Sequence, residues 1–431
     1  MQSVWSKSSV LPKFQSLKED IKTDVLIIGG GIAGILTAFA LKQAGVDYTL
    51  VEAQTICSGI TKNTTAKITS QHGLIYNKIT KTYGKEKAKM YLDANENALL
   101  KYMHLCESID CDFEKRDAYV YSLNSRKKIE DEVSALNDIG FAARFVNNTS
   151  LPFSVAAAVK FENQAQFNPL KFLSKIAAGL NIYEHTRVIE LIGLKARTET
   201  ASITAKKIIV ATHFPFINKH GCFFMKMYQH RSYVIALSNT ENIDAMYLDE
   251  ATKGMSFRSY GKLLLLGGGD HRTGKKGGKW QELLDFTANN YENAKKEYQW
   301  ATQDCMTLDG ISYIGLYSKN TPDLYVATGF NKWGMTTSLA AAEILCDMVQ
   351  GKENPYSLVF NPERTILHSQ LALNALSNTA SYLTPTTKRC PHMGCALTFN
   401  TQEQSWDCSC HGSRFTKDGK LIDNPATGNL K

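Results

Sequence analysis

Asp24-Val25-Leu26-Ile27-Ile28-Gly29-Gly30-Gly31-Ile32-Ala33-Gly34 is the stretch that decides the fold of this 431-residue chain. Its first half predicts a buried strand, and apolar residues recur at helical spacing from Ile32 through Leu41. In the G-x-G-x-x-G pattern, Gly29 permits the turn, Gly31 lets the backbone approach a pyrophosphate, and Gly34 lets helix and strand pack closely. The stretch therefore predicts a dinucleotide-binding α/β unit, with Ile32 and Ala33 at the helix N-terminus that faces phosphate.

A second short strand and an acid extend this pattern. Tyr48-Thr49-Leu50-Val51 is apolar and ends at Glu52, 18 residues beyond Gly34. An acid at this position can accept hydrogen bonds from an adenosine ribose. This order of strand, loop, helix, second strand and acid favours a nucleotide site over a plain turn. It does not distinguish NAD from FAD.

Another glycine run resembles a second nucleotide loop. Leu263 to Leu266 lead into Gly267-Gly268-Gly269, which could indicate an NAD(P)H site. Residues 270–278 are polar and glycine-rich, and they lack the apolar periodicity of a helix that docks on a sheet. We therefore expect a surface turn here, or a loop near the substrate in which His271 and Arg272 are available to an anionic group.

Cysteine and histidine are interleaved near the C-terminus. Cys390 and His392 form a C-x-H pair, and Cys408 and His411 form a C-x-x-H pair. Two thiolates and two neutral imidazoles can hold a [2Fe–2S] cluster, with cysteines on one iron and histidines on the other, and they can also hold a tetrahedral zinc ion. A zinc site has no need for the additional Cys395 and Cys410, so the extra pair favours the cluster. The other six cysteines are scattered and predict buried or unpaired thiols: Cys57, Cys106, Cys111, Cys222, Cys305 and Cys346.

Both boxes resemble the Rieske family, including Gly394 and the Gly412-Ser413 turn. The resemblance implies that the C-x-H and C-x-x-H pairs are the iron ligands, and that a disulfide joins Cys395 to Cys410 over the cluster. High-potential respiratory Rieske proteins have a serine at the position of Ser413 and a tyrosine two residues later, where this chain has Phe415. One hydrogen-bond donor is missing, so we predict a potential below the respiratory type.

The C-terminal segment departs from the Rieske pattern in length. Full Rieske domains open with several strands, whereas residues 366–389 predict a short helix, Ile366 to Leu376, and a Ser/Thr-rich linker. The tail after Phe415 is also expected to stop before a closing strand. We therefore expect an abbreviated cluster-binding segment that depends on the rest of the chain, or on another subunit, to exclude water.

Three further segments resemble the D-amino-acid oxidase and glycine oxidase superfamily. They are Ile208 to Thr212 followed by His213, Trp300 to Gly315, and Leu324 to Gly329 followed by Gly334-Met335-Thr336-Thr337 and a helix from Ser338 to Val349. Asn63 to Lys67 and Gln71 to Tyr76 resemble flavoproteins that join such a domain to a Rieske segment. The resemblance implies FAD, with Thr328, Gly329, Gly334 and Met335 on the flavin side, because a helix N-terminus at Gly334 can stabilise charge on reduced flavin.

These observations predict an α/β fold with a Rossmann-like FAD-binding domain, an inserted mixed-sheet substrate domain and a small Rieske segment. The expected divisions are FAD-binding parts 1–78, 151–215 and 300–352, substrate-domain parts 79–150 and 216–299, a linker 353–387 and the Rieske segment 388–431.

Composition sets limits on partners. Hydrophobic residues make up 43% and charged residues 21%, as in globular proteins, and no stretch is long and apolar enough to span a bilayer. The net charge of +8 is mild and scattered, so no nucleic-acid partner is expected. The first residues lack a signal-peptide pattern, which predicts a cytoplasmic protein.

Taken with the resemblance, the motifs predict an FAD-dependent oxidoreductase that oxidises an amine or amino acid and relays electrons through the cluster to an external acceptor. The alternatives are an electron carrier or reductase without an amine substrate, and a flavoprotein with a structural zinc tail. The sequence identifies no catalytic base. His72, His213 and Arg272 are polar candidates, each favoured as structural.

Overall fold

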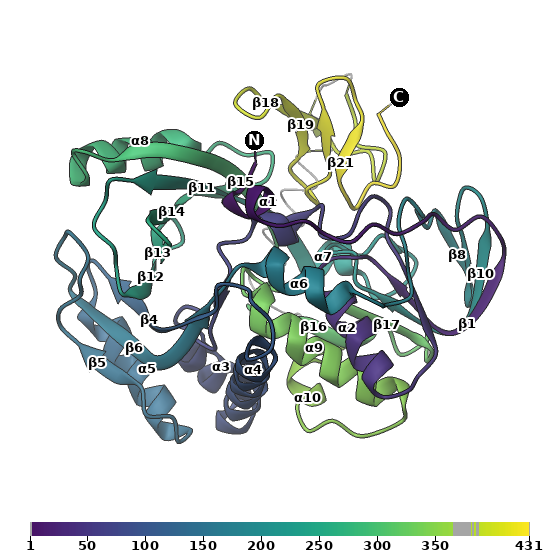
Figure 1. Ribbon diagram of the computed structural model, residues 1–431, viewed down its shortest axis with the longest axis horizontal. Coiled ribbons are helices and arrows are strands. Elements are labelled where there is room, and N and C mark those ends of the chain that lie inside the picture. Colours follow the sequence, from purple (N-terminus) through teal and green to yellow (C-terminus); the bar gives the residue numbers. More distant parts are fainter. Residues whose placement is uncertain (1, 365–380, 382, 385–387, 431) are drawn as a thin grey trace.

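The computed structural model describes residues 2–364, 381, 383–384 and 388–430. Within them the chain forms three sheets, two large ones that share a helical layer and a small C-terminal one (Figure 1). This arrangement confirms the predicted α/β class with a mixed-sheet second region. The helix expected over 366–376 lies outside the described residues.

The first sheet has eight strands and contains the glycine-rich loop. β1 lies between β10 and β2 and is parallel to both, with Ile27 opposite Ile209 on one side and Leu50 on the other. β17 adds to β10 in parallel, so the carboxyl ends of β1, β10 and β17 meet at one edge. The strands are β1 (Ile21–Ile28), β2 (Tyr48–Val51), β7 (Ile182–Tyr183), β8 (Glu190–Ile192), β9 (Lys195–Arg197), β10 (Ser202–Val210), β16 (Tyr313–Leu316) and β17 (Leu324–Thr328).

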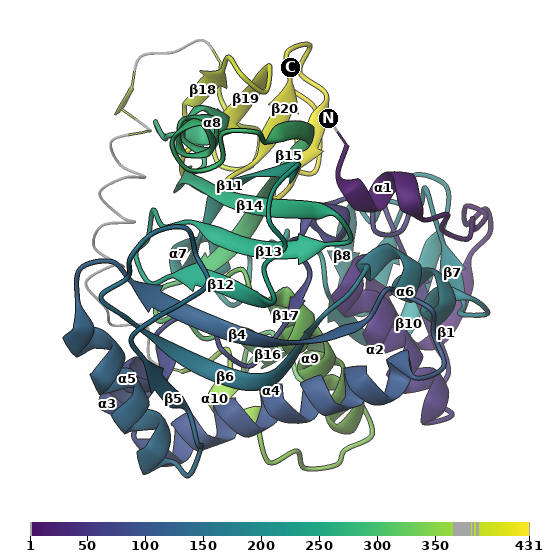
Figure 2. The same ribbon diagram turned by 60° about the vertical axis from the view of Figure 1, so that its left-hand side comes forward.

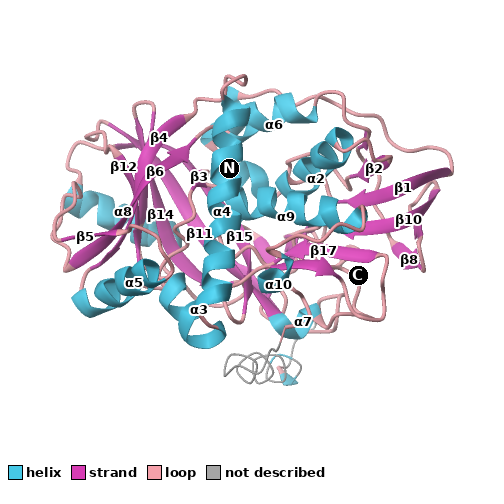
Figure 3. Cartoon of the chain, turned by 90° about the horizontal axis from the view of Figure 1, so that it is seen from below, coloured by secondary structure: helices cyan, strands magenta, loops and turns pink. Residues whose placement is uncertain are grey.

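Helices α2 and α9 pack against one another beside this sheet, and α4 runs along the boundary with the second sheet (Figure 3). Apolar side chains of all three helices, many of them Ala, Ile and Leu, are buried in one core. Burial of these side chains holds the two large sheets together. The helices are α1 (Val4–Ser8), α2 (Ile32–Gln43), α3 (Ile75–Tyr83), α4 (Lys85–Cys106), α5 (Arg126–Asp138), α6 (Pro169–Ala177), α7 (Phe223–Lys226), α8 (Lys279–Asn290), α9 (Gly334–Val349), α10 (Ser357–Phe360) and the 3-10 turn η1 (Ile60–Asn63).

The second sheet has nine mostly antiparallel strands. It runs in the order β15-β11-β14-β13-β12-β4-β6-β3, with β5 paired to β6. β6 ends at Gln166, so the chain leaves this sheet later than the expected division at residue 150. The strands are β3 (Lys67–Ile68), β4 (Glu114–Ser122), β5 (Arg144–Val146), β6 (Ala157–Gln166), β11 (Met227–Ser238), β12 (Ala245–Asp249), β13 (Ser256–Tyr260), β14 (Leu263–Arg272) and β15 (Lys295–Thr307).

The two faces of this sheet have different neighbours. Val234 and Trp300, directly opposite one another on β11 and β15, join the core shared with the first sheet. Tyr233 and Ile235 point the other way and pack with Trp280 of α8. From His230 to Ile235, residues of even number therefore face the first sheet and residues of odd number face outward, whereas Met227 at the start of β11 packs with residues of the first sheet.

The C-terminal segment corrects the expectation of a missing closing strand. β18 (Leu397–Asn400), β19 (Ser405–Cys408), β20 (Arg414–Thr416) and β21 (Leu421–Asp423) form an antiparallel sheet. The sequence after Phe415 thus makes one more strand, because Leu421 pairs with Phe415. This sheet stands on the outer face of the nine-stranded sheet, next to α8 (Figure 2).

No helix in the described parts of the chain combines the length and the apolar character needed to cross a membrane.

Candidate functional site

The loop between β1 and α2 has a conformation that only glycine fits at two positions. Gly29 has φ +114°, and a Cβ there would lie 2.5 Å from the carbonyl oxygen of Ala211. A Cβ on Gly34 would lie 1.9 Å from the oxygen of Gly29. Gly31 is different, since its Cβ would meet only the Thr61 hydroxyl at 3.4 Å. The Ile32 N–H at the start of α2 donates to the Thr61 hydroxyl at 3.1 Å, and the space in front of Gly31 fits the close approach of a dinucleotide pyrophosphate.

Glu52 lies at the end of β2 beside this loop. Its carboxylate accepts a hydrogen bond from the Gly30 N–H at 2.7 Å and another from the Gln54 N–H at 2.8 Å. Burial raises the pKa of Glu52, while these N–H donors oppose that shift. The predicted ribose-binding acid is therefore held in place by the same loop that would bind the pyrophosphate.

The predicted flavin-side residues lie together at the end of β17. Thr328 donates a hydrogen bond to the carbonyl oxygen of His213, which joins β17 to the end of β10. Gly329 has φ +70°, and Asn331 fixes the following turn by donating to the Gly329 oxygen at 2.7 Å and accepting from the Thr307 N–H at 2.7 Å. Sequence reasoning missed Asn331, although its left-handed backbone, φ +50°, is typical of asparagine in such turns.

Helix α9 begins at Gly334, the residue at which the sequence placed the helix N-terminus, and ends at Val349. Met335 is buried, and its carbonyl oxygen accepts a hydrogen bond from Tyr102 at 3.1 Å. The N-terminus of α9 thus lies where β17 ends, as expected for a helix that stabilises reduced flavin.

His72 has contacts that favour a structural role. Its Nε2 lies 2.9 Å from the carbonyl oxygen of Thr69 and therefore donates, while Nδ1 accepts from the Tyr91 hydroxyl at 2.6 Å. Its ring stacks on Trp333 with 4.8 Å between centroids. Burial lowers the pKa of His72 to about 3, so the side chain is neutral and both nitrogens are engaged.

The four predicted cluster ligands lie in two close pairs, one of histidines and one of cysteines. The rings of His392 and His411 lie 5.0 Å apart at 84°, and the Cys390 and Cys408 thiols are hydrogen-bonded to one another. Cys395 and Cys410 form a disulfide with their Cα atoms 6.5 Å apart. The sulfur of Cys408 lies within 4.8 Å of this pair, so the disulfide lies beside the ligand set.

The imidazoles of this site have the free nitrogens that a metal cluster requires. Nδ1 of His392 and both ring nitrogens of His411 are buried and have no hydrogen-bond partner among the described residues. Burial lowers the pKa of His392 to about 4 and that of His411 to about 3, so both imidazoles are neutral, the form that binds metal. Buried polar atoms are almost always satisfied, and a [2Fe–2S] cluster held by these histidines would supply the missing partner.

The cluster loops dock onto the start of β11 through backbone contacts. Gln229 donates to the carbonyl oxygen of His411 at 2.9 Å, and Gln303 donates to that of Gly412 at 2.9 Å. Gly412 has φ +84°, and a Cβ there would lie 2.5 Å from the Cβ of Gln229, so only glycine permits this approach. Sequence reasoning missed both glutamines, because nothing local marks them.

Arg272 and His213 also lie at this junction. Arg272 donates to the carbonyl oxygens of Ser409 at 3.1 Å and Cys410 at 3.2 Å, so its guanidinium holds a cluster loop. His213 precedes Phe214, whose ring lies 6.3 Å from that of His411. The contacts of Arg272 favour positioning of the C-terminal sheet over a role in catalysis, whereas Nε2 of His213 is buried without a hydrogen-bond partner among the described residues.

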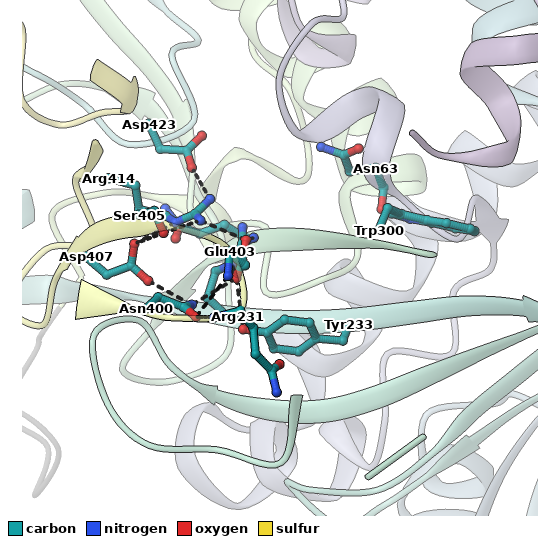
Figure 4. A network of polar contacts seen from close by, with 12 residues as sticks. Asn63, Arg231, Tyr233, Trp300, Asn400, Glu403, Ser405, Asp407, Arg414 and Asp423 are labelled. Carbon is teal, nitrogen blue, oxygen red and sulfur yellow. Dashed lines mark hydrogen bonds and ion pairs between the residues drawn. The ribbon is translucent and has the colours of Figure 1, made fainter. Parts of the chain in front are cut away.

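A buried ion-pair network makes the second docking contact (Figure 4). Glu403 lies between Arg231 of β11 and Arg414 of β20, and Tyr233 donates to it at 2.9 Å. Arg414 also pairs with Asp407 at 3.0 Å. Glu403 therefore joins the nine-stranded sheet to the C-terminal sheet through charged hydrogen bonds from both sides.

Comparison with known proteins assigns both parts. The family model for FAD dependent oxidoreductases, DAO, matches residues 24–348, which is most of the chain. The chain belongs to the FAD dependent oxidoreductase family. The model for the Rieske [2Fe-2S] domain matches residues 363–431, so this FAD dependent oxidoreductase has FAD and a [2Fe–2S] cluster as its cofactors.

Individual relatives agree with this assignment. YhfW of Bacillus subtilis (strain 168), whose name describes a Rieske 2Fe-2S iron-sulfur protein, is 34% identical over 100% of this chain and 97% of its own length. Glycine oxidase from Geobacillus kaustophilus shares the fold with a TM-score of 0.66 at 18% identity, over 80% of this chain and 99% of that chain. L-proline dehydrogenase from P. horikoshii gives 0.66 at 17% identity, over 80% and 98%.

Proposed function

We propose that this FAD dependent oxidoreductase oxidises an amine or an amino acid and passes the electrons through its [2Fe–2S] cluster to an external acceptor. Oxidation of an amine to an imine releases two electrons and two protons; FAD takes the electrons as a pair, and the cluster carries them one at a time. The named substrates of glycine oxidase and L-proline dehydrogenase, which share the fold, support an amine nitrogen as the reacting group.

The contact between the two cofactor regions carries this proposal. Asn424, next to β21, donates to the carbonyl oxygens of Thr212 and Phe214, both at 2.6 Å, directly after β10. The same segment accepts the hydrogen bond of Thr328, and the ring of His411 faces Phe214. The candidate cluster ligand and the candidate flavin loop therefore have common neighbours, which supports direct electron transfer.

Anaerobic spectroscopy tests the proposal. Holoenzyme is mixed with glycine, L-proline, n-butylamine and 1,4-diaminobutane while flavin absorbance and the cluster EPR signal are recorded. We expect at least one of them to bleach the flavin first and to generate the signal of the reduced cluster second. If none bleaches the flavin, and a one-electron donor reduces the cluster before the flavin, electrons flow in the reverse direction and the proposal fails.

A further inference from the structure

One face of β11 and β15 carries buried polar atoms that the fold leaves without partners. Nδ1 of His230, Oγ of Ser232 and Oγ1 of Thr302 are buried and make no hydrogen bond within the described residues. His230 lies opposite Asp304, and Ser232 lies opposite Thr302, so these four side chains share the face that points toward the first sheet. Buried polar groups are rarely unsatisfied, so this patch requires the polar groups of a ligand or of water.

The two cations whose charges act on Asp304, Lys332 and Arg231, are each paired with another carboxylate. Asp270 pairs with Lys332, and Arg272 donates to the carbonyl oxygens of the cluster loop. Asp304 makes no ion pair and no hydrogen bond with any residue that the structure describes. Asp304 is half-buried, and an ammonium group in direct contact with it would add an ion pair that the described residues do not supply.

The patch adjoins the candidate flavin loop. Lys332 lies between Gly329 and the start of α9, and its backbone has φ +74°, which directs the chain toward Asp270. Met227, the first residue of β11, lies 3.7 Å from the Thr328 hydroxyl through its sulfur. Along β11, His230 lies three positions and Ser232 five positions from Met227, and the charge of Lys332 acts on both His230 and Asp304.

We propose that this patch binds an ammonium group of the substrate, with Asp304 as its counter-ion and the Ser232 and Thr302 hydroxyls as hydrogen-bond acceptors. The inference rests on the proposed amine oxidation and names its substrate class. A nitrogen whose C–N bond is oxidised must be neutral, so the ammonium at Asp304 is a second nitrogen. The substrate class is an alkyl diamine or polyamine, and a carboxylate in place of the second nitrogen would be repelled by Asp304.

Calorimetry on oxidised holoenzyme tests this with two matched ligands. 1,4-Diaminobutane and 4-aminobutanoate have the same spacing and differ in the charge at one end. We expect the diamine to bind at least tenfold more tightly to the native protein. Equal affinity, or tighter binding of 4-aminobutanoate, would overturn the inference, and this comparison needs no variant.

Substitutions assign the effect to one side chain. Asp304→Asn should weaken diamine binding about tenfold or more, because a charged hydrogen bond contributes about 1.5–3 kcal/mol. Asp304→Glu should retain part of the affinity, and Asp244→Asn, the same change at an exposed position, should bind as the native protein does. Flavin content and the cluster EPR signal establish that each variant is folded; an Asp304→Asn variant that is folded and binds normally would contradict the inference.

The outcome separates this inference from the proposed function. If the diamine binds in an Asp304-dependent way but does not bleach the flavin, the binding site is correct and amine oxidation is wrong. If glycine or L-proline bleaches the flavin equally in the native protein and in Asp304→Asn, amine oxidation is correct and the diamine site is wrong.

Discussion

Ser413 and Phe415 determine the hydrogen bonding available near the cluster thiolates. The Ser413 hydroxyl is hydrogen-bonded to the Cys390 thiol and accepts from the Ala426 N–H at 3.0 Å. Phe415 is fully buried and has no hydroxyl to offer. These two positions supply one hydrogen-bond donor to the cluster region, whereas respiratory Rieske proteins have two. The predicted reduction potential therefore stays below the respiratory type.

Ser413→Ala should lower the reduction potential of the cluster by about 60 mV. A hydrogen bond of about 1.4 kcal/mol stabilises the reduced, more negative cluster, and this energy corresponds to about 60 mV for one electron. An EPR-monitored redox titration measures the shift, and Phe415→Tyr should move the potential in the opposite direction. Unchanged potentials in both variants would show that these side chains do not tune the cluster.

Asp304 gives diamine binding a defined pH dependence. Burial raises its pKa to about 6, partly offset by Lys332, so the carboxylate is ionised above pH 6 and protonated below it. Burial lowers the pKa of His230 to about 4, so this neighbour stays neutral over that range, and the carboxylates beside Lys332 raise the pKa of its ammonium group.

Affinity for 1,4-diaminobutane should therefore be constant from about pH 7 to 8 and should decrease about tenfold per pH unit well below pH 6. Calorimetry across this range measures the decrease. The same profile in Asp304→Asn should be flat near pH 6, and an unaltered slope would assign the titration to another group. Because this pKa is raised in the folded state, ionisation of Asp304 also lowers stability as pH rises through 6, and a bound cation offsets that loss.

At the scale of the element, the β1–α2 unit depends on how closely its helix approaches its strand. A side chain at Gly34 would clash with the backbone oxygen of Gly29, and backbone is unable to move aside as a flexible side chain does. Only three residues separate the end of β1 at Ile28 from the start of α2 at Ile32, so the helix begins directly against the strand.

Gly34→Ala should lower the free energy of unfolding by about 1–3 kcal/mol, the usual cost of overpacking, and should reduce the bound FAD. Thermal unfolding and the flavin absorbance of the purified protein measure both effects. Gly428→Ala is the matched control, because a Cβ at Gly428 meets nothing within 4 Å. Full FAD content in Gly34→Ala would contradict the role given to this close approach.

At the scale of the whole molecule, Glu403 determines how the cluster sheet stands on the oxidoreductase. Burial alone would raise its pKa, but the charges of Arg231 and Arg414 outweigh burial and hold the pKa at about 2. The folded-state pKa lies below the ordinary value of 4.5, so this stabilisation is present above about pH 4.5 and is lost as pH falls toward 2.

Glu403→Gln should destabilise the docked arrangement by about 3–5 kcal/mol, because it leaves Arg231 and Arg414 buried with less compensating charge. Electron transfer from flavin to cluster, measured by stopped-flow absorbance, should become slower. The loss of stability between pH 4.5 and 2 should become smaller. Glu190→Gln, which alters an exposed pair with Arg197, should behave as the native protein. Equal behaviour of the two variants would show that docking does not depend on this network.

Local sequence determined the dinucleotide loop and the metal ligands. Gly29, Gly34 and Glu52 were predictable because a tight turn against a strand restricts the residue types that fit, whatever surrounds it. The Rieske domain was predictable because ligands two or three residues apart can come together through short loops alone; Cys390, His392, Cys408 and His411 stay its predicted ligands.

Tertiary structure decided what lies between the two cofactor regions. Gln229 meets His411 across 182 residues of sequence, and Arg231 meets Glu403 across 172. The pairing of Ser232 with Thr302, and of His230 with Asp304, depends on the register of β11 against β15. Register follows from which faces of a sheet are buried in the finished fold, so no local pattern in either strand reveals it.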